Sequence, residues 1–303
     1  MTMLSGGVGG ARLARALDRD DVDLTVVVNV GDDALTHGVY VSPDLDTVVY
    51  TLAGAEGPRG WGLADDSTRV MDTLAWLGAD TTFAIGDRDL ATNLYRTAGL
   101  ADDRPLSAIT AEIASAYEVR PRVLPATDDP VRTRVHLDDG VVDFQEYFVR
   151  RRHADTVHDL SFDGATTSRP APGVLEAITG ADVVVIAPSN PPLSIWPILA
   201  VPGITDAVTG AERVIAVSPL FGGVALKGPA HDVMASLGLP PGNEGVVAAY
   251  DGLLSDLVVD AGDAADRNAI AGPELRVHVT DTRFADPERA ATFGSWLCTV
   301  ASN

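Results

Sequence analysis

The sequence predicts an α/β fold of the doubly wound, Rossmann-like type, with a mostly parallel sheet and a mixed, mainly helical insertion. Short apolar runs rich in β-branched residues alternate with helical stretches along the 303-residue chain, which is typical of parallel sheets. A glycine-rich segment also follows the first apolar run and precedes a helical pattern. We therefore expect residues 1–60 and 173–303 to form a Rossmann-like nucleotide-binding core, and residues 61–172 to form an insertion subdomain with helices and a β-hairpin.

The core strands are expected where the chain is apolar and β-branched over a few residues. These runs are residues 1–4, 24–29, 183–187, 214–218, 257–260 and 276–280. The first helix is expected at residues 11–18. The last is expected at residues 290–300, after Asp286-Pro287, because Asp can cap a helix and Pro can occupy its first turn.

The middle of the chain has a different pattern. Residues 66–77, 90–97 and 107–118 have helical character. Asp138-Asp139-Gly140 separates two alternating segments, residues 133–137 and 141–147, and Asp-Gly in such a place predicts a β-hairpin. The polar run 150–172 is expected to connect this insertion back to the core.

The charge balance excludes several classes of protein. Lys and Arg number 22 and Asp and Glu 43, so the net charge is -21, and 34 of the acids are Asp. A negative surface repels phosphate backbones and anionic lipid headgroups, so we expect no nucleic-acid partner and no membrane partner. So many Asp residues cannot serve one site. Their excess favours adaptation to high salt, as in a halophile. The alternative is a high-GC genome, which would explain why Lys227 is the only lysine.

Other features predict a cytoplasmic location. No apolar run approaches the roughly 20 residues that span a bilayer. The N-terminus lacks a basic region followed by a long apolar one, so it does not resemble a signal peptide. Cys298 is the single cysteine and cannot form an internal disulfide bond.

The glycine-rich segment between the first strand and the first helix predicts a phosphate site. Glycines let the backbone approach an anion closely, and a helix N-terminus offers free N–H groups. Gly6, Gly7, Gly9 and Gly10 do not form G-x-G-x-x-G, because Arg12 stands at the last position, and no Walker A motif occurs. The pattern indicates a nucleotide or phosphate without saying which. The alternative is a tight turn with a packing role.

Acidic segments follow the next predicted strand. Asn29 and Asp32-Asp33 lie at its carboxyl end, where ligands bind in open α/β sheets. These carboxylates could bind a sugar hydroxyl or a cation, or form a solvated acidic turn. Asp44 and Asp46, in Ser-Pro-Asp-Leu-Asp-Thr, suit Mg²⁺. With equal weight, Asp46 could cap a helix.

Three later loops also carry candidate residues. Asp87-Arg88-Asp89 follows an apolar segment, and Arg88 could contact an anion or form an internal ion pair. Ser189, Asn190 and Ser194 follow the strand predicted at residues 183–187 and supply neutral hydrogen bonds suited to a base or ribose. Ser218 and Gly222 follow the strand predicted at 214–218, and Lys227 stands nearby. His37, close to Asp32-Asp33, is the only histidine of interest.

Together these motifs resemble one family. LSGGVGGARLARAL, VVVNVGDDALTHGVYVSPDLDTVVYTLAG, GDRDLATNLYRT and APSNPPLSI occur in the expected order. The sequence resembles the 2-phospho-L-lactate transferases of coenzyme F-420 biosynthesis over nearly its whole length. With the acidic composition, this suggests a halophilic archaeal source. The resemblance implies a Mg²⁺-dependent transfer of a phospholactyl or phosphoenolpyruvyl group from a guanosine-diphosphate-linked donor to the ribityl hydroxyl of the deazaflavin Fo, with release of GMP. A homodimer is one option for the assembly.

The resemblance also implies roles for the candidate residues. Asp44 and Asp46 would bind Mg²⁺ and act in catalysis, with Asp46 as a general base that contacts the acceptor. Asp87 and Arg88 would complete the acceptor side. Donor-binding residues would be Gly6, Gly7, Gly9, Gly10, Arg12, Asn29, Asp32, Ser189, Asn190, Ser194, Ser218 and Gly222. Asn93 stands where the family pattern has His, so no acid–base role is assigned to it.

Two other functions compete with the transferase. A non-enzymatic nucleotide-sugar-binding regulator, like the gluconeogenesis and cell-shape factors, would share the glycine segment. It would carry Asp-Asp-Gly-Gly-Ser-Ser where this chain has Asp32-Asp33-Ala34-Leu35-Thr36. A nicotinamide oxidoreductase would need the missing G-x-G-x-x-G.

Overall fold

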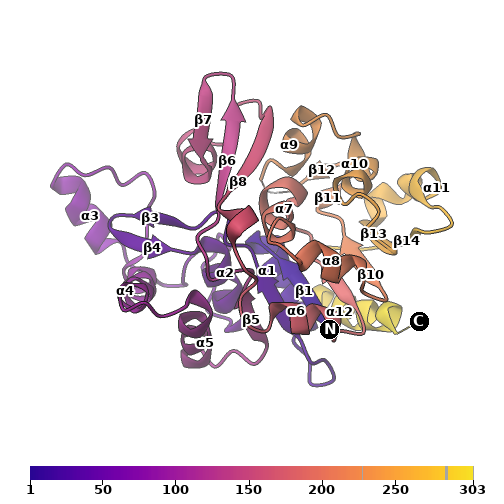
Figure 1. Cartoon of the computed structure of the whole chain (residues 1–303), viewed down its shortest axis with the longest axis horizontal. Helices are drawn as coiled ribbons and strands as arrows, with labels where there is room; N and C mark the ends of the chain where they lie inside the picture. The colour runs from indigo at the N-terminus through magenta and orange to yellow at the C-terminus, as the bar shows by residue number, and fades with distance from the viewer. Residues whose placement is uncertain (227, 284–285, 303) are drawn as a thin grey trace.

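The computed structural model describes residues 1–226, 228–283 and 286–302, and a seven-stranded parallel sheet forms its centre (Figure 1). Its strand order is β14-β13-β10-β9-β1-β2-β5, with every neighbouring pair parallel. These strands are β1 (Thr2–Ser5), β2 (Thr25–Val28), β5 (Arg122–Pro125), β9 (Val184–Ile186), β10 (Val214–Val217), β13 (Asp256–Asp260) and β14 (Arg276–Thr280). The predicted fold class is confirmed.

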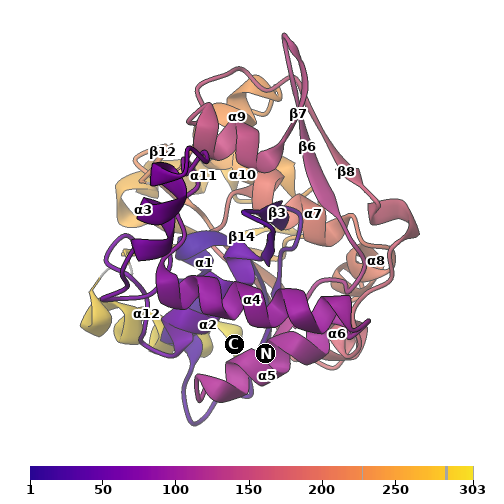
Figure 2. The same ribbon diagram turned by 90° about the vertical axis from the view of Figure 1, so that its left-hand side faces the viewer.

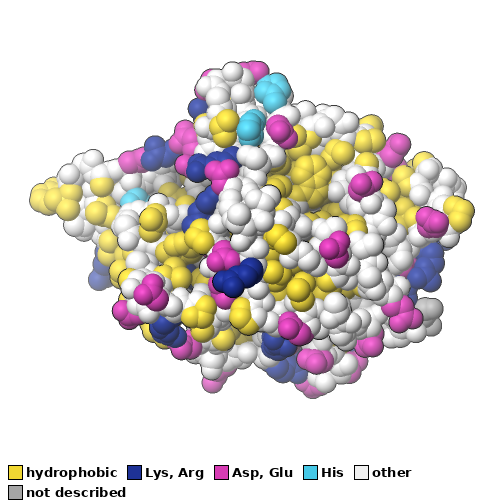
Figure 3. Space-filling model, in the orientation of Figure 1, with side chains coloured by type: hydrophobic (Ala, Val, Ile, Leu, Met, Phe, Trp, Pro, Cys, Tyr) yellow, Lys and Arg dark blue, Asp and Glu magenta, His cyan; other side chains and the backbone are white. Residues whose placement is uncertain are grey.

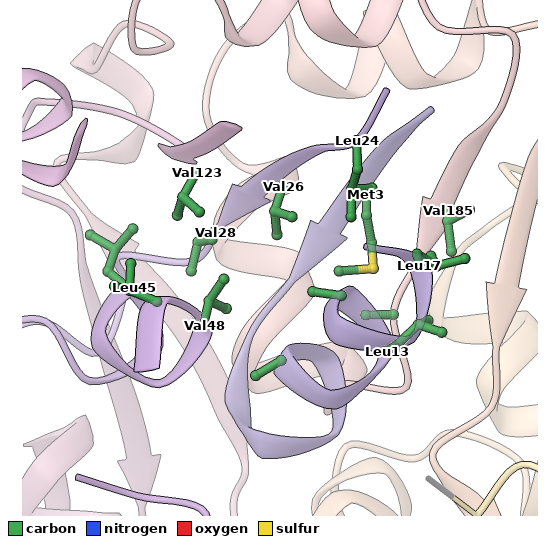
Figure 4. Packing of buried hydrophobic residues seen from close by; sticks show 14 of the residues in the cluster. Met3, Leu13, Leu17, Leu24, Val26, Val28, Leu45, Val48, Val123 and Val185 are labelled. Atoms are coloured by element: carbon green, nitrogen blue, oxygen red, sulfur yellow. The ribbon is translucent and has the colours of Figure 1, made fainter. Parts of the chain in front are cut away.

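Helices cover both faces of this sheet because successive strand side chains point to opposite sides. Met3, Val26 and Val28 pack with one set of helices, as Figure 4 shows for Leu13 and Leu45. That set is α1 (Gly7–Leu17), α2 (Pro43–Leu52), α5 (Leu106–Ala116) and α12 (Pro287–Ala301). The opposite face carries α6 (Val174–Thr179), α7 (Trp196–Leu199), α8 (Ile204–Thr209) and α10 (Gly242–Ala249).

Two smaller units project from this body (Figures 1 and 2). One holds the hairpin β3 (Ala34–Thr36) and β4 (Val39–Val41) with α3 (Arg69–Trp76) and α4 (Asp87–Ala101). The other is the antiparallel sheet of β6 (Arg132–Leu137), β7 (Gly140–Asp143) and β8 (Asp159–Asp163), which packs on the body through Val135, Leu193 and Val233.

The remaining elements are short, and most of them belong to the C-terminal half of the chain. They are β11 (Leu220–Phe221), β12 (Val224–Ala225), α9 (Ala230–Ser236), α11 (Arg267–Ile270), the π-helical turns Glu146–Arg150 and Pro191–Ile195, and the 3-10 turns Ala165–Thr167 and Ala261–Asp266. Within the described ranges, no helix is both long and apolar enough to cross a bilayer.

Some elements differ from the predictions. Strand β5 lies inside residues 61–172 yet pairs with β2, so this range supplies an edge strand of the central sheet and is not purely an insertion. Helix α1 begins at Gly7, four residues before its predicted start, because the glycines themselves form its first turn. Residues 141–147 form a strand only as far as Asp143, and a π-helical turn follows.

The order of the strands places a topological switch between β1 and β9. From β1 the chain moves outward to β2 and β5, and from β9 it moves the opposite way to β10, β13 and β14. The connections that leave the carboxyl ends of β1 and β9 therefore diverge to opposite faces, which opens a crevice between them.

Candidate active site

A cleft with a volume of ≈ 1010 Å³ opens at the carboxyl ends of β1, β2 and β9. Its lining joins the glycine segment, the start of α2, the loop after β9 and segments of the projecting units. Ten of the predicted residues line it: Gly6, Gly7, Gly9, Arg12, Asp32, Asp44, Asp46, Ser189, Asn190 and Ser194. The crevice at the switch point is therefore the place where most of the sequence motifs meet.

The glycine segment is held by side chains from two other motifs. The Gly7 N–H donates to Asp44 Oδ1 at 2.7 Å, and the Gly6 N–H donates to Ser189 Oγ at 3.1 Å. Gly7 has a φ of +67°, which favours glycine, and a Cβ on Gly6 would lie 2.6 Å from Asp44 Oδ2. This segment thus joins the acidic motif to the loop after β9.

The remaining residues of the segment differ in their surroundings. A Cβ on Gly9 would lie 2.7 Å from the Pro188 carbonyl oxygen, so close packing explains this glycine. Gly10 lies outside the cleft lining and packs against Ser5 and Ala187. Arg12 does line the cleft and lies 3.9 Å from Glu56.

Asn29 ties two buried carboxylates together beneath the cleft. Its Nδ2 donates to Asp32 Oδ1 at 3.2 Å and to Asp44 Oδ2 at 3.0 Å. Burial raises the pKa of Asp44 to about 6, and burial together with the Asp44 charge raises the pKa of Asp32 well above its ordinary value. Two carboxylates with one shared amide donor leave a local excess of negative charge.

Asp33, next to Asp32 in the chain, does not line the cleft. Ser42 Oγ donates to its Oδ2 at 2.9 Å, while its buried Oδ1 has no hydrogen-bond partner. Burial raises the pKa of Asp33 to about 7. Asp33 is thus a further buried carboxyl with a raised pKa at the carboxyl end of β2, although the Arg132 and Arg96 charges partly oppose the effect of burial.

The fit of a metal ion can be judged from these donors. Among the described residues, no group of three or more His, Cys, Asp or Glu side chains could hold a metal by itself. Asp32 and Asp44 supply two hard oxygen donors, and Mg²⁺ usually takes one or two carboxylates together with water and substrate phosphates. The pair therefore fits a cation that a phosphorylated substrate helps to bind.

Asp46 has a different environment from its neighbour Asp44. Arg96 forms a bidentate ion pair with it: Nη1 donates to Oδ2 at 3.1 Å and Nη2 donates to Oδ1. Both groups are buried. A guanidinium already pairs with the Asp46 carboxylate, whereas Asp44 has only neutral donors. The two residues that were predicted to bind Mg²⁺ together therefore differ in their electrostatic surroundings.

The Arg96 guanidinium links Asp46 to a second carboxylate, Asp89. Arg96 Nη1 donates to Asn93 Oδ1 at 2.7 Å, and Asn93 Nδ2 donates to the Asp89 carbonyl oxygen at 2.9 Å. The Tyr50 hydroxyl donates to Asp89 Oδ1 at 2.9 Å. Burial and the Asp46 charge raise the pKa of Asp89 to about 6. Asn93 thus has a structural place in the site although it is not the family's histidine.

The loop after β9 forms the opposite wall. Asn190 Oδ1 accepts from the Leu193 N–H at 3.2 Å and starts a π-helical turn, whereas its buried Nδ2 has no hydrogen-bond partner. Ser194 lies close to Gly6. An unsatisfied buried amide donor in a cleft wall is suited to a ligand carbonyl or phosphate oxygen.

Several predicted residues lie elsewhere. Asp87 accepts from the Arg69 and Val70 N–H groups at 3.1 and 3.0 Å at the start of α3, and Arg88 donates to the Ala64 carbonyl; neither lines the cleft. Ser218 is buried and donates to Asn243. Gly222 borders a separate cavity of ≈ 440 Å³. Lys227 lies outside the described residues.

Several residues that the sequence did not point to also line the cleft. Arg59, Trp61, Phe83, Gln145, Phe148 and Arg283 are among them. Arg283 follows β14, so the carboxyl-end rule applied to the last strand would have found it. The others come from connections without a strand-end signal. His37 Nε2 donates to the Phe83 carbonyl oxygen at 2.8 Å, and His37 does not line the cleft.

The fold and the cleft define a class of protein: a Rossmann-like α/β protein with an acidic crevice at its switch point. The chain matches the family model described as 2-phospho-L-lactate transferase CofD over residues 1–283, and it belongs to that family.

Similar curated proteins agree with this assignment. One from Streptomyces avermitilis is named phosphoenolpyruvate transferase and is 41% identical over 96% of this chain and 94% of its own length. Another of the same name, from Thermobifida fusca, is 39% identical over 96% of this chain and 94% of its own. These relatives are actinobacterial, so the expected halophilic archaeal source has no support.

A solved structure shares the fold. A member of the UPF0052 family from Bacillus halodurans is 18% identical to this chain and has a TM-score of 0.64, covering 97% of this chain and 98% of its own. At this level of identity the match concerns the fold alone.

Proposed function

We propose that this protein transfers a phosphoenolpyruvyl group from a guanosine-diphosphate-linked donor to the ribityl hydroxyl of the deazaflavin Fo and releases GMP. The family supports transfer of a phosphorylated three-carbon acid in coenzyme F-420 biosynthesis. The names of the relatives favour the enolpyruvyl group over the lactyl group. The observation that carries the proposal is the meeting of Asp32, Asp44 and the loop after β9 in one cleft.

The proposal gives each wall of the cleft a task. Ser189, Asn190 and Ser194 would hold the guanosine part, supported by the unsatisfied Asn190 Nδ2. Arg12, with Arg59 and Arg283, would face the phosphates, since all three line the cleft. Trp61 and Phe83 supply apolar surface for the flat ring of the acceptor.

Mg²⁺ fits the same scheme as the resident cation. When bound, it would neutralise the diphosphate and stabilise the leaving phosphate oxygen. Asp32 and Asp44 would hold it, and Asn29 would orient both carboxylates from below. The Gly7 N–H would fix the direction of Asp44 Oδ1.

The test is incubation of the purified protein with Fo, Mg²⁺ and each synthetic donor, read by mass spectrometry. We expect an enolpyruvyl-phosphate adduct of Fo together with GMP, and less adduct from the lactyl donor. No adduct from either donor would overturn the proposal. It would favour the alternative, a regulator that binds a nucleotide sugar without turnover.

A further inference from the structure

We propose that Asp89 is the general base that takes the proton from the acceptor hydroxyl, and that Arg96 and Asn93 position it. This inference rests on the proposed function. It replaces Asp46, which the sequence favoured for that role. The carboxylates of the cleft differ in the groups that each one already binds.

Asp46 is poorly suited to accept a proton. Both of its oxygens accept from Arg96, and its side chain is only 8% exposed. Proton transfer to Asp46 would leave the buried Arg96 charge without its partner, which is costly at a site removed from water. Asp32 and Asp44 are engaged by Asn29 and are suited to a cation.

Asp89 lines the same cleft, and its two carboxylate oxygens have different surroundings. Its Oδ1 accepts from the Tyr50 hydroxyl at 2.9 Å and lies 3.4 Å from Asn93 Nδ2. Its Oδ2 lies beside Gly62, where a Cβ would be 3.8 Å away, and Gly62 is itself part of the cleft lining. The fixed Oδ1 thus orients Oδ2 for a hydroxyl in the cleft.

The groups around Asp89 adjust its basicity. Asp46 from α2 and Asp66 from the preceding loop raise its pKa, whereas the Arg96 charge and the Tyr50 hydroxyl lower it. Burial is the largest cause, and the resulting pKa is about 6. A base is most effective when its pKa lies near the working pH, so Asp89 is better matched than an exposed Asp.

The chemical step balances with these groups. The acceptor oxygen forms a bond to the acid-bearing phosphorus, while the bond from that phosphorus to the bridging oxygen breaks and GMP leaves. The hydroxyl proton passes to Asp89 Oδ2 and then to water. Arg96 takes no part in bond making, since it pairs with Asp46 and donates to Asn93 beside Asp89.

The test compares Asp89→Asn with wild type and with Asp102→Asn, an exposed acid at the far end of the same helix. We expect Asp89→Asn to lower kcat by about 10²–10⁴-fold with little change in Fo binding, measured by fluorescence. Asp102→Asn should keep wild-type turnover. Because an amide removes a buried negative charge, the melting temperature of Asp89→Asn should not fall.

Tyr50→Phe tests whether Asp89 accepts a proton, because a purely structural role of Asp89 would leave the pH dependence of kcat unchanged. Loss of the hydroxyl donor raises the pKa of Asp89, so the acid limb of log kcat against pH should move to higher pH by about 0.5–1 unit. In Asp89→Asn the limb near pH 6 should disappear.

Each failure has its own signature. Wild-type protein that forms no adduct would remove the proposed function and this inference together. Three outcomes would overturn only the role of Asp89. Asp89→Asn could turn over within about threefold of wild type, or it could raise KM and keep kcat. The third outcome is an acid limb that does not move in Tyr50→Phe. An acid limb lost in Asp46→Asn and kept in Asp89→Asn would return that role to Asp46.

Discussion

Two buried aspartate clusters stand at opposite ends of the same central sheet. Asp256 begins β13 and accepts from Arg213 Nε and Nη2 at 2.9 and 2.8 Å, from Arg276 at 2.9 Å and from His278 at 2.7 Å. These partners hold the pKa of Asp256 far below its ordinary value. At the carboxyl end, Asp32 and Asp44 share only Asn29, and their pKa values are raised.

We infer from this difference that Asp256 has a structural role, whereas the proposed role of Asp32 and Asp44 is functional. Asp256 has more positive partners than its own charge requires, so it joins three strands and needs no ligand. Asp32 and Asp44 lack such partners, so the folded protein bears an electrostatic cost that a cation and its phosphates can offset.

The largest effect is expected at the structural cluster. Asp256→Ala should lower the free energy of unfolding by about 3–5 kcal/mol, because it leaves Arg213 buried without its carboxylate. Urea denaturation measures the loss. Activity per folded molecule should stay the same, and adding Arg213→Met should recover part of the stability. A loss below about 1 kcal/mol would show that the cluster is not structural.

At the cluster of Asp32 and Asp44, the functional cluster, a substitution should lower turnover rather than stability. Asp44→Asn should lower kcat by about 10²–10³-fold, the usual cost of removing one preorganised electrostatic group. Its melting temperature should equal or exceed that of wild type because one repelling carboxylate is gone. Steady-state assays and thermal melting test both halves. If Asp44→Asn were destabilised and kept a normal kcat, Asp44 would have a structural role and the proposed contrast with Asp256 would be wrong.

Mg²⁺ should stabilise the protein through the functional cluster alone. With a dissociation constant of about 1 mM, 10 mM Mg²⁺ would add about 1.4 kcal/mol, and EDTA should remove it. The gain should vanish in Asp44→Asn and persist in Asp256→Asn. Calorimetry at pH 8 provides the measurement, and an equal gain in all three proteins would contradict the assignment.

The smallest effect concerns pH. Asp33 has a folded pKa of about 7, above its unfolded value, so the folded form binds the extra proton. Stability from this site is therefore present below the unfolded pKa and is lost as pH rises through about 7. Between about pH 8 and pH 6.3 we expect wild type to gain about 1 kcal/mol more than Asp33→Asn. Equal gains, measured by urea unfolding, would show that Asp33 is not buried as described.

Asp256 should show the opposite sign in acid. Its folded pKa is lowered, so its contribution is present above the unfolded pKa and is lost as pH falls below about 4. This loss therefore lies outside the pH window of the Asp33 comparison.

Much of the fold was predictable because its signals are local. The apolar runs at β1, β2, β9, β10, β13 and β14 are β-branched and bounded by polar residues. Strand β5 was missed, since only Val123 and Leu124 lie between Arg122 and Pro125 and four residues give little periodicity. Its place comes from pairing with β2, a contact between distant segments.

The acidic residues likewise include some features that the sequence predicts and others that it does not. Figure 3 shows acidic side chains scattered over the visible face, in keeping with a solvated surface. The sequence could name Asp32, Asp44 and Asp46 as candidates by their position after strands. The sequence could not show that Asp46 pairs with a guanidinium and Asp44 does not, although the two residues stand in one turn of α2.

By itself, the sequence determined six of the seven central strands, the glycine segment at the first turn and the family motifs, because each depends on neighbouring residues. The tertiary structure decided which carboxylates are compensated. Arg96 reaches Asp46 from 50 positions away and Arg213 reaches Asp256 from 43 positions away. Folding brings these charges together in a low-dielectric interior, where the distance between them sets their energy.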